Sequence, residues 1–142
     1  MQTGVAISEL IPQRPPVVLV DRFGGIDGEG VSHTEFVVVP ACLFCEEGRL
    51  TECGLIEHMA QSAAARAGWL ARQQGRDVAL GYIGSVNRFR VGTFPPVGSR
   101  LETTIRVVQE VFNVSLVKAT TCLNGEVVAE GELKIFLDDA AE

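Results

Sequence analysis

Residues 51–75 read TECGLIEHMAQSAAARAGWLARQQG and carry one long helical pattern. At about 100° per residue, a single arc collects apolar side chains, and its members are Ile56, Met59, Ala60, Ala63, Ala64, Ala67, Leu70 and Ala71. Thr51 suits the N-cap, Glu52 suits the positive end of the helix dipole, and Gly75 suits the position after the last turn. These signals predict a helix over residues 52–74. Its many alanines predict that another element approaches it closely.

Glu57 is a carboxylate at the edge of this apolar helix. A buried charge is costly unless it is paired, so a helix that buries itself has no structural need for an acid there. Two interpretations are open at this point. Glu57 is either a solvated acid at the helix rim, paired with an arginine or water, or a catalytic acid.

The rest of the chain has the composition and periodicity of β-strands. A β-branched run at 17–23 follows Pro15-Pro16, and a second run at 32–39 ends before Pro40. Four more strands are expected after the helix, at 78–90, 101–111, 114–123 and 127–137, with Asn124-Gly125 as a two-residue hairpin turn. This order predicts an α+β fold in which one long helix lies against a mostly antiparallel sheet.

Composition bounds the class of protein. A length of 142 residues fits one domain spanning 1–142, and 46% hydrophobic with 21% charged residues is an ordinary globular composition. A net charge of −6 argues against a general nucleic-acid binder, because such proteins present a basic surface to phosphate. The sequence has neither a signal-like N-terminus nor an apolar run of about 18 residues. We therefore expect a cytoplasmic protein without a membrane span, with its four cysteines reduced.

Three motifs occur in a fixed order along the chain. They are LIPQRPPVVLVDR at 10–22, LIEHMAQ at 55–61, and NRFR at 87–90 followed by PVGSRLE at 96–102. Together they resemble the motifs of the 3-hydroxyacyl-(acyl-carrier-protein) dehydratases and cover most of the chain. This resemblance implies the hot-dog fold, in which an antiparallel sheet wraps a long helix and two subunits form a continuous sheet.

The resemblance also implies a chemistry for Glu57. Dehydration of a 3-hydroxyacyl thioester needs a base for the proton next to the carbonyl, an acid for the departing hydroxyl, and donors for the enolate-like oxygen. In the family, a histidine and an acid share the first two tasks across the dimer interface. The acid matches Glu57, and Gln61, one turn later, is placed to orient it or the ligand.

Several family positions differ in this chain. Leu43, followed by Phe44, stands where the family has its catalytic histidine, and Gln13 replaces the histidine of the opening motif. Thr51-Glu52 replaces a Pro-Gly pair whose backbone binds the thioester. The chain thus resembles a divergent branch, the dehydratase-like hot-dog proteins of aryl-polyene pigment clusters. We expect the substrate to lie against Gln13, Leu43, Phe44 and Gly54.

Only two histidines are present to replace the missing one. His58 is adjacent to Glu57, but consecutive helix residues point about 100° apart, so the two do not face each other within one subunit. Across a dimer, His58 is a third candidate catalytic residue beside Glu57 and Gln61. His33, in an expected strand, is interpreted as structural or exposed.

The cysteines suggest an alternative metal site. Cys42 and Cys45, with Cys53 and His58, are of the types that zinc favours. A lone Cys-x-x-Cys is weak evidence, and free cysteine often serves as a small buried hydrophobe. We therefore expect neither a metal nor another cofactor.

Three arginines, Arg88, Arg90 and Arg100, are predicted to cluster around one strand and the following turn. Guanidinium groups bind phosphate well, so this cluster is a candidate docking site for acyl-carrier protein, with coenzyme A thioesters as the alternative substrate form. Solvated strand charges are an equally acceptable interpretation. A homodimer is expected from the resemblance.

Three functions follow from these observations. The first is a 3-hydroxyacyl thioester dehydratase, a lyase of fatty-acid or polyene-type synthesis, with Glu57 as the acid/base group. The second is a non-catalytic hot-dog subunit that binds an acyl chain or assists an active paralogue. The third is an acyl thioesterase, because hot-dog thioesterases also use an acid on the long helix to activate water.

Overall fold

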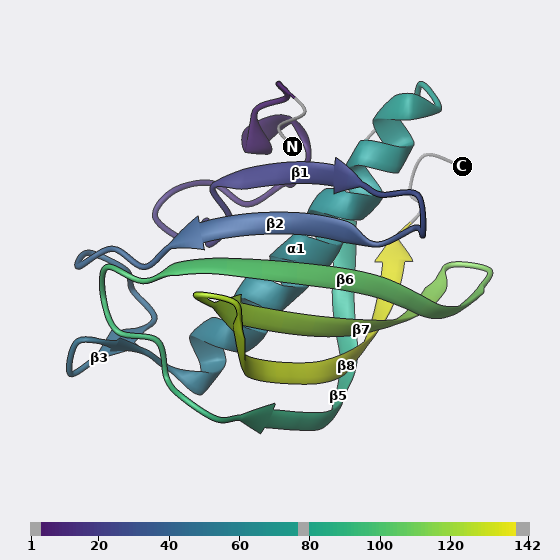
Figure 1. The fold of residues 1–142 in the computed structure, drawn as a ribbon. Coiled ribbons are helices and arrows are strands. Elements are labelled where there is room, and N and C mark those ends of the chain that lie inside the picture. The colour runs from purple at the N-terminus through teal and green to yellow at the C-terminus, as the bar shows by residue number, and fades with distance from the viewer. Residues whose placement is uncertain (1–3, 77–79, 139–142) are drawn as a thin grey trace.

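One long helix lies against a six-stranded antiparallel sheet in the computed structural model, which describes residues 4–76 and 80–138 (Figure 1). The helix, α1, spans Glu52–Gln73. The sheet curves around the helix, and the N-terminal segment lies over the far end of the helix (Figure 1). The predicted α+β arrangement of the hot-dog fold is confirmed.

The sheet order places strands from both halves of the chain side by side. Its order is β1 (Arg22–Ile26), β2 (Ser32–Val37), β6 (Arg100–Val111), β7 (Val114–Leu123), β8 (Glu126–Asp138) and β5 (Leu80–Val91). A 3₁₀ turn, η1 (Ile7–Glu9), precedes the sheet, and the small hairpin β3 (Cys45–Glu46) and β4 (Arg49–Leu50) precedes the helix. Strand β6 therefore pairs with β2 although the helix and β5 lie between them in the sequence.

The local signals of the helix and of one turn are confirmed. The Thr51 hydroxyl oxygen accepts the Gly54 N–H at 3.2 Å and caps the helix. Gly75, with φ of 70°, follows the last turn in the left-handed conformation that ends many helices. Asn124 (φ 54°) and Gly125 (φ 83°) connect β7 to β8, as a two-residue turn with two left-handed positions requires.

The first expected strand is wrong over most of its length. The sequence predicts a strand at 17–23, but β1 begins only at Arg22, opposite Glu35 of β2. The backbone of Leu19 is instead hydrogen-bonded by two side chains of α1, so this segment pairs with the helix rather than with the sheet. The start of the fifth strand, expected at residue 78, lies outside the described residues, and β5 is described from Leu80.

The buried face of the helix differs from the predicted arc. Met59, Ala63 and Ala71 are buried as expected, whereas the arc members Ile56, Ala60, Ala64, Ala67 and Leu70 are only half-buried. The face against the sheet contains His58, Gln61 and Ser62, each fully buried. These polar side chains are buried because each has hydrogen-bond partners on distant segments, which hydrophobic periodicity does not register.

Strand β5 forms one edge of the sheet. It pairs with β8 from Leu80 opposite Asp138 to Val91 opposite Ala129, and no described strand lies on its other side. Two large side chains near its start are exposed, Tyr82 (53%) and Ile83 (38%). None of the helices in the described part of the chain is long and apolar enough to cross a membrane.

Candidate functional site

A cavity of about 450 Å³ lies between α1 and the inner face of the sheet. The half-buried side of the helix forms one wall, through Ala60, Ala63, Ala64, Ala67 and Leu70. The opposite wall includes apolar side chains from four strands, Ile83, Val107, Val117 and Ile135, together with the polar side chains Glu110 and Ser115. The alanines that predicted a close neighbouring element therefore leave room for a ligand.

Glu57 lines this cavity beside the first turns of the helix. Gln61, one turn later, donates from Nε2 to Glu57 Oε2 at 2.8 Å. This bond occupies one carboxylate oxygen and leaves Oε1 for a ligand. The predicted pairing of Gln61 with Glu57 is thus present in the structure.

Gln61 is itself fully buried and fixed by the segment before β1. The Leu19 N–H donates to Gln61 Oε1 at 2.6 Å, and Gln61 Nε2 donates to the Val17 carbonyl at 2.7 Å. A backbone N–H only donates and a carbonyl only accepts, so these partners define which end of the amide is oxygen. The Gln61 nitrogen must therefore face Glu57.

Gln13 lines the same cavity, although 44 residues separate it from Glu57 in the sequence. Its Oε1 atom is buried and has no hydrogen-bond partner among the described residues. A buried acceptor without a partner is costly, so this oxygen is suited to accept a hydrogen bond from a ligand. Gln13, Glu57 and Gln61 are the predicted site residues that the fold brings together.

His58 points away from this cavity, into the core. It is fully buried, its Nδ1 lies 2.7 Å from the Leu19 carbonyl oxygen, and its Nε2 lies 2.7 Å from the Thr103 hydroxyl. Burial lowers the pKa of the His58 imidazole from 6.5 to about 4, so the ring is neutral at pH 7. The expectation that His58 reaches a shared pocket is not supported, because both ring nitrogens are bonded inside one protomer.

His33 is also outside the cavity. Its Nε2 lies 3.0 Å from Asp27 Oδ2 on the exposed face of β2. The hydrogen bond with His33 is the main cause that lowers the pKa of the Asp27 carboxyl to about 2. The interpretation of His33 as an exposed residue agrees with this position.

Leu43, Phe44 and Gly54 lie near the start of the helix and do not line the cavity within one protomer. Leu43 is 62% exposed. The Gly54 N–H is already bonded to Thr51, and a Cβ at Gly54 would lie 2.8 Å from the Phe44 Cβ. The contact of these residues with substrate stays a prediction, and in this protomer Gly54 allows close packing at the helix start.

The predicted arginine cluster is wrong. Arg88 and Arg90 belong to the edge strand β5, whereas Arg100 begins β6, which lies three strands away, or about 14 Å. Each guanidinium instead pairs with a carboxylate, in the pairs Arg88–Glu132 (3.5 Å), Arg90–Glu130 (3.0 Å) and Arg100–Glu35 (2.7 Å). The sequence places these arginines close together, but the strand order separates them.

The alternative zinc site is not assembled. Within residues 4–76 and 80–138, no group of three or more histidine, cysteine, aspartate or glutamate side chains is placed to hold a metal ion. Burial, with a smaller effect of the neighbouring Cys42 thiol, raises the pKa of the Cys45 thiol to about 11. His58, the fourth ligand of that hypothesis, is held by Leu19 and Thr103 in the core.

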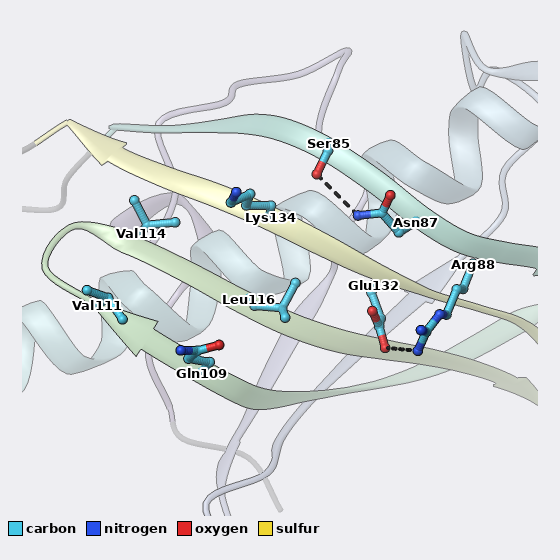
Figure 2. A pocket seen from close by; sticks show the side chains of 9 residues that line it. All are labelled: Ser85, Asn87, Arg88, Gln109, Val111, Val114, Leu116, Glu132 and Lys134. Atoms are coloured by element: carbon cyan, nitrogen blue, oxygen red, sulfur yellow. Dashed lines mark hydrogen bonds and ion pairs between the residues drawn. The ribbon is translucent and has the colours of Figure 1, made fainter.

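A second hollow, of about 690 Å³, lies on the opposite face of the sheet. Figure 2 shows its lining side chains on neighbouring strands, with Arg88 paired to Glu132 and Ser85 bonded to Asn87. Its charged groups are an ion pair and Lys134 at the surface, without a carboxylate held by an amide as in the first cavity. The first cavity is therefore the candidate site.

Arg66 is a residue of the first cavity that sequence reasoning missed. It is half-buried, its Nη2 donates to the Gly30 carbonyl at 3.4 Å, and its buried Nε has no partner within the part of the chain that the structure describes. Burial lowers the pKa of this guanidinium, and the charge of Glu110, which lines the same cavity from β6, opposes that change. An arginine inside an alanine-rich helical stretch is the signal that indicates such a position.

Solved structures share this fold. One is the dehydratase heterocomplex ApeI:P from Xenorhabdus doucetiae, with a TM-score of 0.88, 19% identity, and coverage of 97% of this chain and 94% of that chain. Another is a hypothetical thioesterase with coenzyme A from Streptococcus pneumoniae, with a TM-score of 0.65, 11% identity, and coverage of 82% and 84%. A third is the Escherichia coli PaaI protein of the phenylacetic acid degradation operon, with a TM-score of 0.62, 15% identity, and coverage of 80% of both chains.

Sequence comparison is more specific than fold comparison. No curated protein sequence matches the chain. A family model does match, that of the ApeP-like proteins, described as ApeP dehydratase, and the match extends over residues 5–142. The chain therefore belongs to the ApeP-like dehydratase family.

Proposed function

We propose that the cavity beside Glu57 binds a 3-hydroxyacyl thioester and that Glu57 is an acid/base group for its dehydration. One observation carries this proposal. A carboxylate oriented by Gln61 and the free acceptor of Gln13 line the same cavity, whose longer walls are largely apolar. Membership of the ApeP-like dehydratase family supports the reaction class.

The residues of the cavity fit the parts of such a substrate. The alanine side of the helix and the facing aliphatic side chains suit an acyl chain. The 3-hydroxyl group of the substrate would donate to Gln13 Oε1. Dehydration removes a proton from C2, breaks the bond between C3 and that hydroxyl oxygen, and delivers a proton to the departing hydroxyl, which leaves as water. Glu57 would carry one of these two proton transfers.

The second proton-transfer group is proposed to come from another subunit. No histidine lines the cavity among the described residues. The edge strand β5 leaves one side open for another sheet, and the cavity wall includes Tyr82 and Ile83 of that strand. We infer a dimer through this edge, either of two copies of this chain or with a related hot-dog subunit. The similar structure from Xenorhabdus doucetiae is a dehydratase heterocomplex, which supports the second form.

We infer an acyl-carrier-protein thioester as the substrate form, in fatty-acid or polyene-type synthesis, with a coenzyme A thioester as the alternative. The structure from Streptococcus pneumoniae contains coenzyme A, which supports thioester binding by this fold. The four cysteines are free thiols, which fits a reducing compartment, and we infer the cytoplasm.

A second candidate is a non-catalytic subunit that binds the acyl chain and supports an active paralogue. The lack of a histidine in the described cavity wall favours it. A thioesterase is a third candidate, in which Glu57 would activate water. The free acceptor of Gln13 favours a hydroxylated substrate and therefore the dehydratase.

The test follows mass changes of 3-hydroxyacyl and enoyl carrier substrates with the wild-type protein and with Glu57→Gln. The proposal expects loss or gain of one water with wild type, and no change with the folded variant. Release of free acid supports the thioesterase. Equal turnover by Glu57→Gln would refute the role of Glu57, and binding without turnover by both proteins supports the non-catalytic subunit.

A further inference from the structure

One turn of α1 holds Leu19 by both of its backbone groups. Gln61 Oε1 accepts the Leu19 N–H at 2.6 Å, and His58 Nδ1 lies 2.7 Å from the Leu19 carbonyl oxygen. All three residues are buried, with exposure of at most 1%. The Leu19 backbone therefore connects His58, which does not contact Glu57, to Gln61, which does.

We propose that His58 is a positioning residue for Glu57, acting through Leu19 and Gln61. The functional meaning of this link rests on the proposed role of Glu57. The link itself is structural. His58 fixes the Leu19 carbonyl, the Leu19 N–H fixes Gln61 Oε1, and Gln61 Nε2 fixes Glu57 Oε2 at 2.8 Å.

The hydrogen bonds of His58 have only one consistent direction. A carbonyl oxygen only accepts, so Nδ1 carries the proton that bonds Leu19. In the neutral ring, Nε2 then accepts, and the Thr103 hydroxyl must donate to it at 2.7 Å. The Thr103 oxygen in turn accepts from Thr121 at 2.7 Å. This chain anchors His58 to strands β6 and β7.

The anchoring gives His58 little freedom to move. Its ring stacks on Phe36 with 5.6 Å between ring centroids and 29° between ring planes. Strands β6 and β7 thereby fix the position of the imidazole, and the imidazole fixes the Leu19 backbone. The Leu19 N–H in turn orients the Gln61 side-chain amide beside the cavity. Ser62, the next helix residue after Gln61, bonds Thr34 of β2 at 2.7 Å, which fixes the same helical turn to the sheet independently.

Two substitutions at position 58 separate the two contacts of the imidazole. In His58→Asn, the amide nitrogen takes about the place of Nδ1 and keeps the bond to Leu19. In His58→Gln, the longer amide reaches toward Thr103 and leaves the Leu19 carbonyl without its donor. Thr103→Val is the matched control, because it removes the other partner of the ring and leaves the Leu19 contact in place.

The readout is the Gln61 side-chain amide, followed by NMR in the ligand-free protein. Exchange of its protons with solvent is expected to become about fivefold to tenfold faster in His58→Gln, as loss of one hydrogen bond implies. His58→Asn and Thr103→Val are expected to stay near wild type. Unchanged Gln61 protons in His58→Gln, or equal acceleration in all three variants, would overturn the proposal.

Two further measurements keep the test decisive. Long-range ¹H–¹⁵N spectra of wild type must show the neutral Nδ1–H form of His58, and the Nε2–H form overturns the proposal even if His58→Gln does not fold. Where lyase activity is present, His58→Gln should lower kcat at nearly constant KM, with recovery in His58→Asn. Absence of lyase activity in wild type would reject the proposed function, whereas the NMR results would still decide the positioning link.

Discussion

Acidification is expected to destabilise this fold through His58 before any carboxylate with a lowered pKa contributes. In the folded protein the ring is fully buried, and its pKa is lowered to about 4 by desolvation. In the unfolded chain its pKa is near 6.5. Between these two values the unfolded state binds a proton that the folded state does not bind, so the free energy of unfolding falls as the pH falls.

The magnitude follows from the difference between the two pKa values. At 1.36 kcal/mol per pH unit, a fall from 6.5 to about 4 corresponds to about 3 kcal/mol. This contribution is fully present above pH 6.5 and is lost by about pH 4. For a domain with a typical stability of about 5–15 kcal/mol, the loss is a large fraction of the total.

The assay is urea unfolding at intervals over about four pH units, from about pH 7.5 to about pH 3.5. This range includes both pKa values of His58. The control is His58→Asn, which keeps a donor to Leu19 and has no titrating group at this position. The difference between the two curves should change by about 3 kcal/mol over the window from 6.5 to 4. A difference that is flat over this window, or that grows on acidification, would refute the reasoning. Asp27, with a pKa lowered to about 2, contributes only below its ordinary value of 3.8 and so lies outside the window.

Three further predictions concern packing and the cavity. Gln61→Met should lower the free energy of unfolding by about 3 kcal/mol, because it leaves the Leu19 N–H and the Val17 carbonyl without hydrogen bonds. In the same urea titration, Gln73→Met at an exposed position should change it by less than about 0.5 kcal/mol. Gly68→Ala should lower the free energy of unfolding by about 2 kcal/mol, because its Cβ would meet the Leu10 carbonyl. The control is Gly92→Ala, whose Cβ meets only the Val128 carbonyl oxygen at 3.8 Å. Equal stability of the two variants would contradict this packing. Ala64→Leu should fill part of the cavity. Calorimetry should then show binding of long acyl thioesters weakened at least about tenfold, while short thioesters bind as before. An equal loss of affinity for both lengths would argue against a cavity that binds the acyl chain.

Local parts of the fold could be predicted from the sequence because their causes are local. The Thr51 cap, the Gly75 stop and the Asn124-Gly125 turn each depend on residues within a few positions. The predicted helix and the last three predicted strands therefore agree closely with the observed ends. The i, i+4 spacing on the helix predicted that Gln61 contacts Glu57. The resemblance added Gln13, whose proximity to Glu57 in space no spacing rule shows.

The parts that could not be predicted depend on contacts between distant residues. His58 and Gln61 are buried through bonds to Leu19, which lies 39 and 42 residues away. Periodicity assigns polar residues to the surface, so the predicted buried arc is displaced toward the alanines that line the cavity. The arginine cluster fails for the same reason, since the order of strands in a sheet does not follow their order in the chain.

Strand β5 has a consequence for how this protein behaves in isolation. A long edge strand with an open row of backbone groups is a template for any other strand, including that of a misfolded copy. A protomer purified alone is thus expected to aggregate readily, and if it forms the proposed dimer its melting temperature should rise with protein concentration. Production of the chain together with the proposed partner subunit should therefore increase its soluble yield, because that partner would cover this edge.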